Sequence, residues 1–418
     1  MQGTARSLLI LADDLSGAAD CAVGAARSGL ESVVLWGSNT LGHHEQVIAI
    51  DTDTRYQPAA QAAQTQAALW QHYGDAARNT PPRLLYKKID STLRGNYAAE
   101  MAALKSAGVA IVAPAFIQAG RTTLDGRVYV HGVALEQTEV WAHEGIQGVA
   151  DLPHLLQQHG LRTALLPLAD LRSKAASELS RLVHSGEVDA IVCDAQEESD
   201  LTTIAQSSLG LPVYWVGSAG LITHLTEAAG LAGGFEAPRL SVKGSILTVV
   251  GSLSSVSRQQ AVRLAEQAPV EVFAIATDLL QRGEKHVGWP SLAQRIGQAL
   301  SQGRDVMIRT EAEIHEGLIN GSVLTQAVGR LLQPWAAQIG ALVATGGETA
   351  RGLLPFLGAS GLHIVREIET GAPLSVSVGE RRFPVVTKAG AFGQPDTLLN
   401  CYTELAALRL GETHTHLA

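Results

Sequence analysis

Short apolar runs alternate with longer, Ala-rich segments through the first half of the chain. The apolar runs lie at residues 7–12, 32–36, 47–51, 84–89, 110–113, 164–166, 190–194 and 213–216. They lack the two-residue alternation of half-exposed strands, so we predict strands that are covered on both faces. Helical patterns lie between them at residues 17–28, 59–73, 97–107 and 173–185. This order predicts a mainly parallel sheet with a helix layer on each side.

A second series of the same kind follows residues 230–243, a Gly-rich stretch that contains Pro238. Its predicted strands are 246–251, 272–277, 305–309, 341–345, 361–367 and 384–389, and its predicted helices are 256–267, 291–302 and 325–337. A length of 418 residues suits two domains. The expected fold class is therefore α/β, with two doubly wound domains at residues 1–235 and 236–418 and the active site in the cleft between them.

Charge and cysteine content narrow the class of protein. The formal net charge is −9 and no basic block occurs, which argues against a nucleic-acid partner. No segment reaches the length of a membrane span, and the apolar run before Asp13 is too short for a signal peptide. Cys21, Cys193 and Cys401 match no zinc or redox spacing, as in proteins of a reducing compartment. We expect a cytoplasmic protein.

Polar residues gather where the first strands end. Asp13 and Asp14 follow the first apolar run directly, and a predicted helix begins after them. Two carboxylates there can bind a cation, orient hydroxyl groups or accept a proton, and capping of the helix is the simpler alternative. Arg55 ends the motif DTDTR after another strand. Its planar guanidinium suits a carboxylate ligand, although an ordinary surface arginine fits the same pattern.

The densest polar cluster is YKKIDSTLRGN at residues 86–96. Lys87, Lys88, Asp90 and Arg94 come directly after a strand, a pattern typical of a site for an anion or a polyhydroxy compound. A solvated loop is the alternative. Further along, residues 113–135 contain GRTT and a two-residue alternation around Val128, which predict a hairpin that acts as a lid or covers a sheet edge.

Glycine-rich turns follow strands of the second half. Gly251 precedes a run of serines, Gly346 and Gly347 precede a predicted helix, and Gly390 follows Lys388. Backbone N–H groups of such turns at helix starts contact phosphate well, so together they predict a nucleotide cradle. The chain has no GxxxxGK[ST], no GxGxxG after its first strand and no GxSxG, which argues against a Walker-A protein, a nicotinamide dehydrogenase and a nucleophile elbow.

Motifs from residue 12 to residue 393 resemble the four-carbon acid sugar kinases. They are ADDLSGAAD, DTDTR, KKIDSTLRGN, APAF with GRTT, GSLSSVSRQQ, TGGETA and KAGAFG, in that order. The resemblance implies a sugar-acid-binding domain at residues 1–235 and an ATP-binding domain at residues 236–418. It implies a substrate among threonate, erythronate and 3-oxo-tetronate. Leu15 in the first motif resembles the threonate and erythronate members more than the 3-oxo ones, and Ser16 keeps the hydroxyl of the threonine expected there.

The same resemblance assigns roles to individual residues. Contacts to the sugar acid are expected from Asp13, Arg55, Lys87, Lys88, Ile89, Asp90 and Arg94. Contacts to ATP are expected from Ser252, Gly346, Gly347, Glu348, Thr349 and Gly390. Transfer of the γ-phosphoryl group to the C4 hydroxyl, with Mg²⁺ on the phosphates, would use Asp13, Asp14 and Lys88 as catalytic residues. Asp14 is the first candidate for the base.

Other functions stay open at this point. A 3-oxo-tetronate kinase of the same family is the nearest alternative. A nicotinamide-dependent dehydrogenase of sugar acids would need a dinucleotide motif that is missing, and a sensor protein would bind the acid without consuming ATP. The sequence leaves the metal ligands, the stereoisomer and a homo-oligomeric state undecided.

Overall fold

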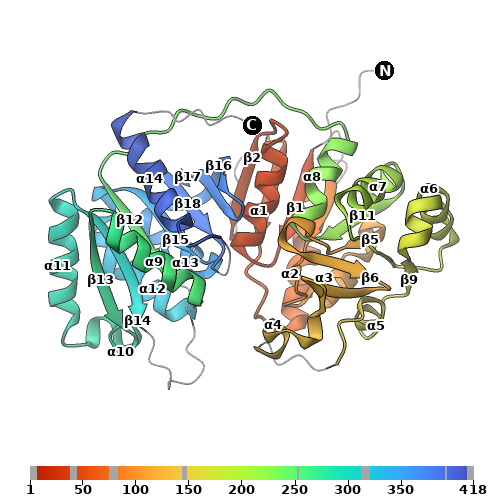
Figure 1. Ribbon diagram of the computed structural model, residues 1–418, viewed down its shortest axis with the longest axis horizontal. Helices are drawn as coiled ribbons and strands as arrows, with labels where there is room; N and C mark the ends of the chain where they lie inside the picture. Colours follow the sequence, from red (N-terminus) through yellow and green to blue (C-terminus); the bar gives the residue numbers. More distant parts are fainter. Residues whose placement is uncertain are drawn as a thin grey trace. The chain divides into compact units, whose positions relative to one another are not determined.

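The computed structural model describes residues 7–37, 45–74, 83–143, 148–251, 254–311, 321–390 and 393–411 (Figure 1). The chain forms two compact units, and each is described here by itself. The N-terminal unit comprises Met1–Val33 and Thr40–Phe235, and the C-terminal unit comprises Val34–Asn39 and Glu236–Ala418. Strand β2, Ser32–Trp36, lies where the chain passes from one unit to the other. Both units have the α/β architecture that the hydrophobic pattern predicts.

Parallel strands form the centre of the N-terminal unit. Their order in the sheet is β3-β1-β4-β11-β5-β10-β9. The bounds are β1 Leu8–Ala12, β3 Val47–Asp51, β4 Leu84–Lys88, β5 Val109–Ala113, β9 Thr163–Leu166, β10 Ala190–Cys193 and β11 Val213–Gly217. Every residue of β1 is fully buried, as expected for a strand covered on both faces. Because β1 lies between β3 and β4, the carboxyl ends of these strands meet at one edge, where doubly wound sheets bind ligands.

Helices cover this sheet in two groups (Figure 1). In one group α1, α8, α7 and α6 pack side by side, and in the other α2 packs against α3. The bounds are α1 Leu15–Ala26, α2 Ala59–Tyr73, α3 Tyr97–Ala103, α4 Glu139–His143, α5 Leu152–Gln157, α6 Leu168–Ser185, α7 Glu198–Ser208 and α8 Ala219–Ala228. The predicted helix 97–107 is divided, since α3 ends at Ala103 and residues 105–107 form a 3₁₀ turn.

The predicted hairpin is present in the N-terminal unit. Strands β6 Arg121–Leu124, β7 Arg127–Val130 and β8 Val133–Ala134 form a separate antiparallel sheet. Asp125 and Gly126 make the turn with φ angles of 51° and 72°. Their N–H groups donate to the Asp194 carboxylate at 2.8 and 2.9 Å. Asp194 follows β10, so the hairpin is held to the carboxyl edge of the main sheet.

The C-terminal unit contains the sheet order β13-β14-β12-β15-β18-β17-β16. Its bounds are β12 Ser245–Val250, β13 Val270–Ala276, β14 Asp305–Glu311, β15 Ile339–Thr345, β16 Ala359–Glu369, β17 Ala372–Gly379 and β18 Pro384–Lys388. The pairs from β13 to β18 are parallel, and β17 pairs antiparallel with both β16 and β18. The helices are α9 Ser255–Gln267, α10 Thr277–Arg282, α11 Trp289–Ser301, α12 Gly321–Leu332, α13 Gly347–Leu353 and α14 Thr397–Leu410.

Several details of this unit differ from the sequence prediction, which contained neither helix α10 nor helix α14. Strand β17 was not predicted, and it makes the far side of the sheet antiparallel. The predicted helix 325–337 is wrong at its carboxyl end, because α12 ends at Leu332 and a 3₁₀ segment, Gln333–Gln338, follows. Pro334 lies in that segment and cannot donate the hydrogen bond that a continued α-helix requires. Across the described parts of the chain, every helix is too short or too polar to cross a membrane.

Candidate active site

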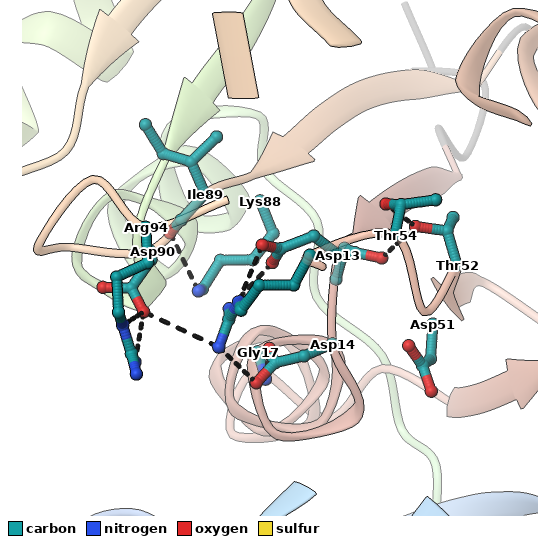
Figure 2. A network of polar contacts seen from close by, with 12 residues as sticks. Asp13, Asp14, Gly17, Asp51, Thr52, Thr54, Lys88, Ile89, Asp90 and Arg94 are labelled. Atoms are coloured by element: carbon teal, nitrogen blue, oxygen red, sulfur yellow. Dashed lines mark hydrogen bonds and ion pairs between the residues drawn. The ribbon is translucent and has the colours of Figure 1, made fainter. Parts of the chain in front are cut away.

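Three of the sequence motifs meet at the carboxyl edge of β1, β3 and β4. In the sheet register Ala12 lies opposite both Asp51 and Lys88, so these strands end at the same level. Asp13 and Asp14 follow β1, the loop with Arg55 follows β3, and Asp90 and Arg94 follow β4. Figure 2 shows the side chains of Asp13, Asp14 and Asp90 converging on one place.

Arg55 lies at the centre of these carboxylates. Its Nε and Nη2 atoms donate to the two oxygens of Asp13, both at 2.9 Å. Its Nη1 atom donates to Asp14 at 2.8 Å and lies 3.7 Å from Asp90. Burial works against the charge of Arg55, but the carboxylates outweigh it and hold the pKa well above the usual value. Asp13, Asp14 and Asp90 are therefore held around a single cation, which is the Arg55 guanidinium.

Asp13 and Asp14 have different surroundings although they are neighbours in sequence. The Asp13 side chain is 3% exposed and that of Asp14 is 24% exposed. Burial raises the pKa of Asp13, but pairing with Arg55 prevails and lowers it overall. One oxygen of Asp14 accepts from the N–H of Gly17 at 2.9 Å and caps α1, while the other accepts from Arg55. Asp14 thus both caps the helix and presents the more accessible carboxylate.

Asp90 is held by its own loop. Its Oδ1 atom accepts from the N–H and the hydroxyl of Thr92 at 2.7 and 2.6 Å, and its Oδ2 atom accepts from Arg94 Nε at 2.7 Å. Burial opposes ionisation, yet Arg94 and Arg55 keep the pKa of Asp90 well below its usual range. The Arg94 side chain is 34% exposed, so it stays reachable for a ligand while it pairs with Asp90.

The adjacent lysines of β4 have different partners. The Lys88 ammonium donates to the carbonyl of Ile89 at 2.9 Å, and the structure records no carboxylate partner for it among the described residues. It lies beside α1, because a Cβ atom on Gly17 would come within 2.9 Å of the Lys88 Nζ atom. The Lys87 ammonium instead pairs with Glu100 at 2.8 Å, where the side chains are 0% and 1% exposed. Lys88 therefore joins the Arg55 cluster, and Lys87 belongs to a buried ion pair.

Three further residues belong to this site: Glu100, which no sequence motif singled out, Arg121 of the predicted hairpin, and Ile89, which was a predicted contact. Glu100 lies inside α3, away from any strand end, and its carboxylate accepts from Thr54. Burial is the main cause that lowers the pKa of Arg121 in the hairpin. The charge of Asp90 raises this pKa and the charge of Arg94 lowers it, so Arg121 lies near both. Ile89 is buried, and its N–H donates to Gly217 at 2.9 Å, so its backbone carbonyl is the part that reaches Lys88.

In the C-terminal unit the predicted glycine turns also come together. Val250 lies opposite Thr345 in the sheet, and Thr345 lies opposite Lys388. The N–H of Gly346 donates to the Lys388 carbonyl at 2.7 Å. The hydroxyls of Ser254 and Ser257 donate to the Gly390 carbonyl at 2.8 and 2.6 Å. The turns after β12, β15 and β18 therefore form one edge of the sheet.

The predicted ATP contacts map onto this edge, apart from one outside the described residues. Gly346 has φ 93° and precedes α13, whose first residues are Gly347, Glu348 and Thr349. A Cβ atom on Gly251 would lie 2.2 Å from the Thr349 hydroxyl, so these turns are closely packed. Ser252 lies outside the described residues.

Lys388 was noted in the sequence without a predicted contact. Its ammonium donates to the Ala389 carbonyl at 2.8 Å, and burial lowers its pKa to about 8. A metal site is not apparent: in the described ranges no three His, Cys, Asp or Glu side chains are grouped to hold an ion.

Comparisons with known proteins agree with this division of the chain. Residues 8–225 match the model of a sugar-binding N-terminal domain, and residues 247–398 match that of a nucleotide-binding C-terminal domain. A Cupriavidus necator protein named D-threonate kinase is 41% identical over 416 residues, which is 96% of this chain and 99% of that protein. A Salmonella typhimurium protein of the same name is 31% identical, over 97% of this chain and 100% of its own length.

The fold also matches a solved structure. A Haemophilus influenzae protein superimposes with a TM-score of 0.74 at 22% sequence identity, covering 95% of this chain and all of its own. The family models and the full-length relatives lead to the same assignment. This chain belongs to the four-carbon acid sugar kinase family.

Proposed function

We propose that this protein is an ATP-dependent kinase that transfers the γ-phosphoryl group to the C4 hydroxyl of D-threonate or D-erythronate. The observation that carries the proposal is the 41% identity, over 96% of this chain, to a protein named D-threonate kinase. A relative named D-erythronate kinase is 28% identical. Relatives named 3-oxo-tetronate kinase, at 27% identity, make that acid the alternative substrate.

The sugar acid is assigned to the Arg55 cluster of the N-terminal unit. Lys88 supplies a cation without a recorded carboxylate partner, so it suits the carboxylate or a hydroxyl of the substrate. Arg94 is 34% exposed and supplies a second cation beside Asp90. Arg55 is surrounded by carboxylates, and its main task is to hold Asp13, Asp14 and Asp90 where they accept hydrogen bonds from substrate hydroxyls.

Asp14 is the group that orients the attacking hydroxyl and takes its proton. Asp13 and Asp90 are nearly buried and have lowered pKa values, which makes both weak bases. Asp14 is the most accessible of these carboxylates, at 24% exposure. Phosphoryl transfer depends mainly on positioning and charge stabilisation, so a base that aligns the hydroxyl is sufficient.

ATP is assigned to the glycine turns of the C-terminal unit. Gly346 precedes α13, and Gly347, Glu348 and Thr349 are its first residues, where backbone N–H groups favour phosphate oxygens. Ser254 and Ser257 hold the Gly390 carbonyl and so fix the neighbouring turn. Mg²⁺ would enter as the MgATP complex, with phosphate and water as most of its ligands and one or two carboxylates as the rest.

The test is ADP release from MgATP in the presence of D- and L-threonate, D- and L-erythronate and 3-oxo-tetronates. We expect turnover with D-threonate or D-erythronate, and a product whose phosphorus is attached at C4 by NMR. A reaction without any sugar acid provides the background rate. ATP binding without turnover on the whole panel would contradict the substrate assignment, and absence of ATP binding would contradict the kinase itself.

A further inference from the structure

We infer that Asn96 and Glu100 are positioning residues that fix the Arg55 loop, defined as residues 52–57, and that Lys87 is the buried counter-ion of Glu100. The inference deepens the proposed function, on which it rests. It assigns Lys87 a place behind the site, in contrast to the substrate contact expected from the family resemblance.

The ion pair between Lys87 and Glu100 lies in the interior of the N-terminal unit. Their charged atoms are 2.8 Å apart, and the side chains are 0% and 1% exposed. Burial of two charges costs free energy unless hydrogen bonds satisfy their remaining atoms. Glu100 meets this condition, because its Oε1 atom accepts from the Thr54 hydroxyl at 2.5 Å and from the Gln66 amide at 3.1 Å.

Thr54 connects this ion pair to the Arg55 cluster. Its hydroxyl lies 2.7 Å from that of Thr52, which donates to the Ala12 carbonyl at 2.8 Å. The backbone N–H of Thr54 donates to the Asp13 carbonyl at 3.1 Å. Glu100 is therefore linked through Thr54 to the carboxyl end of β1, where Asp13 and Asp14 begin.

Asn96 holds the same loop from the other side. Its amide Nδ2 atom donates to the carbonyls of Thr54 and Gln57 at 2.9 and 2.7 Å. These carbonyls flank Arg55 in the chain. Asn96 and Glu100 come from the start of α3, so one element fixes the backbone from which the Arg55 guanidinium extends.

The position of Arg55 sets the positions of the carboxylates around it. A shift of the loop would move the guanidinium relative to Asp13, Asp14 and Asp90, which accept its hydrogen bonds or lie beside it. A misplacement of about 1 Å in an active site can lower the rate about 100-fold. None of this requires Lys87 or Glu100 to touch the substrate, and their burial places them behind the loop.

Thr54→Val tests the link with little change in volume, because it removes the hydroxyl and leaves the Lys87–Glu100 pair in place. We expect kcat/KM for the tetronate to fall about tenfold or more, with the KM for ATP unchanged. Thr203→Val is the control for the same substitution, since the Thr203 hydroxyl donates to the Ser199 carbonyl of its own helix. Equal kinetics for the two variants would overturn the inference.

Amide hydrogen exchange supplies a readout that does not depend on the reaction. Thr54→Val and Asn96→Ala should speed exchange in residues 52–57 relative to the Thr203→Val control, with other segments of the sheet unaffected. If the wild type turned over no tetronate but exchange changed as expected, the proposed function would fail and the positioning role would stand. Unchanged exchange in both variants would overturn the positioning role.

A pair of variants tests the place of Lys87. Glu100→Gln keeps an oxygen for Thr54 but leaves the Lys87 charge buried without its partner, so tetronate turnover and stability should both fall. Lys87→Met combined with Glu100→Gln removes both charges, and it should recover most of the tetronate kcat/KM lost in the single variant. If the double variant folds but its tetronate kcat/KM stays as low as that of Glu100→Gln, the result would contradict the inference and indicate that Lys87 contacts the substrate directly.

Discussion

Asp13 and Asp14 show how neighbouring residues of one type acquire different tasks. Asp13 is nearly buried and binds Arg55 with both oxygens, while Asp14 caps α1 with one oxygen and is the more exposed. Asn caps helices about as well as Asp, so Asp14→Asn should preserve folding. Loss of the base and of its charge should lower kcat by about 10²- to 10⁴-fold, with a smaller loss of ATP binding.

The comparison variant is Asp13→Asn, which removes the charge that pairs with the buried Arg55. Breaking a buried ion pair in this way costs about 3–5 kcal/mol, so this variant should be much less stable than Asp14→Asn. Turnover assays and urea denaturation of both variants measure the contrast. Full turnover in Asp14→Asn, or wild-type stability in Asp13→Asn, would contradict the division of tasks.

Lys388 makes a pH-dependent contribution to the stability of the C-terminal unit. Burial lowers its pKa from 10.5 to about 8. Between about pH 8 and pH 10.5 the unfolded chain keeps the Lys388 proton, whereas the folded chain has released it. The buried charge therefore lowers the stability of the folded chain most below about pH 8, and this effect fades as the pH rises toward 10.5. Lys388→Met should therefore be more stable than the wild type at pH 7, and the difference should shrink by pH 10. Chemical denaturation at several pH values measures it, and a constant difference would show that the pKa of Lys388 is not lowered.

At the scale of the elements, the sequence predicted buried strands well. The runs 32–36 and 47–51 coincide with β2 and β3, because a short continuous apolar segment is typical of a strand that is covered on both faces. Strand β17 was not predicted from the sequence, because Ser375 and Ser377 interrupt its apolar residues. Both serines are buried, and Ser377 is satisfied by the carbonyls of Arg381 and Phe383 within the same hairpin region. Such local hydrogen bonding leaves no trace in a hydropathy pattern.

The sequence predicted the location of the candidate site because of the sheet topology. It could not predict all of the site's residues, because their side-chain directions are not evident from the sequence. Strand ends of a parallel sheet meet at one edge, so polar residues after β1, β3 and β4 had to lie near one another. Adjacent residues of a strand point to opposite faces, and the sequence does not tell which face carries the ligand. It therefore could not separate Lys88 from Lys87, nor connect Glu100 of α3 to Thr54.

At the scale of the whole molecule, the proposal gives each ligand to a different unit of the chain. Substitutions in separate units should then act independently on binding, although turnover requires both ligands. Lys88→Met should raise the tetronate KM about 10- to 100-fold by removing a charged hydrogen bond, and it should leave the ATP dissociation constant unchanged.

Gly346→Ala is the converse variant. Gly346 has φ 93° and ψ 137°, a conformation in which an L-residue with a Cβ atom is strained by about 1–3 kcal/mol. The strain should distort the turn that meets the Lys388 carbonyl and weaken ATP binding about 5- to 100-fold, with tetronate affinity unchanged. Calorimetric titration of each variant with each ligand separates the two effects. If either substitution changed the affinity for the other ligand by a similar factor, the ligands would not be divided independently between the units as proposed.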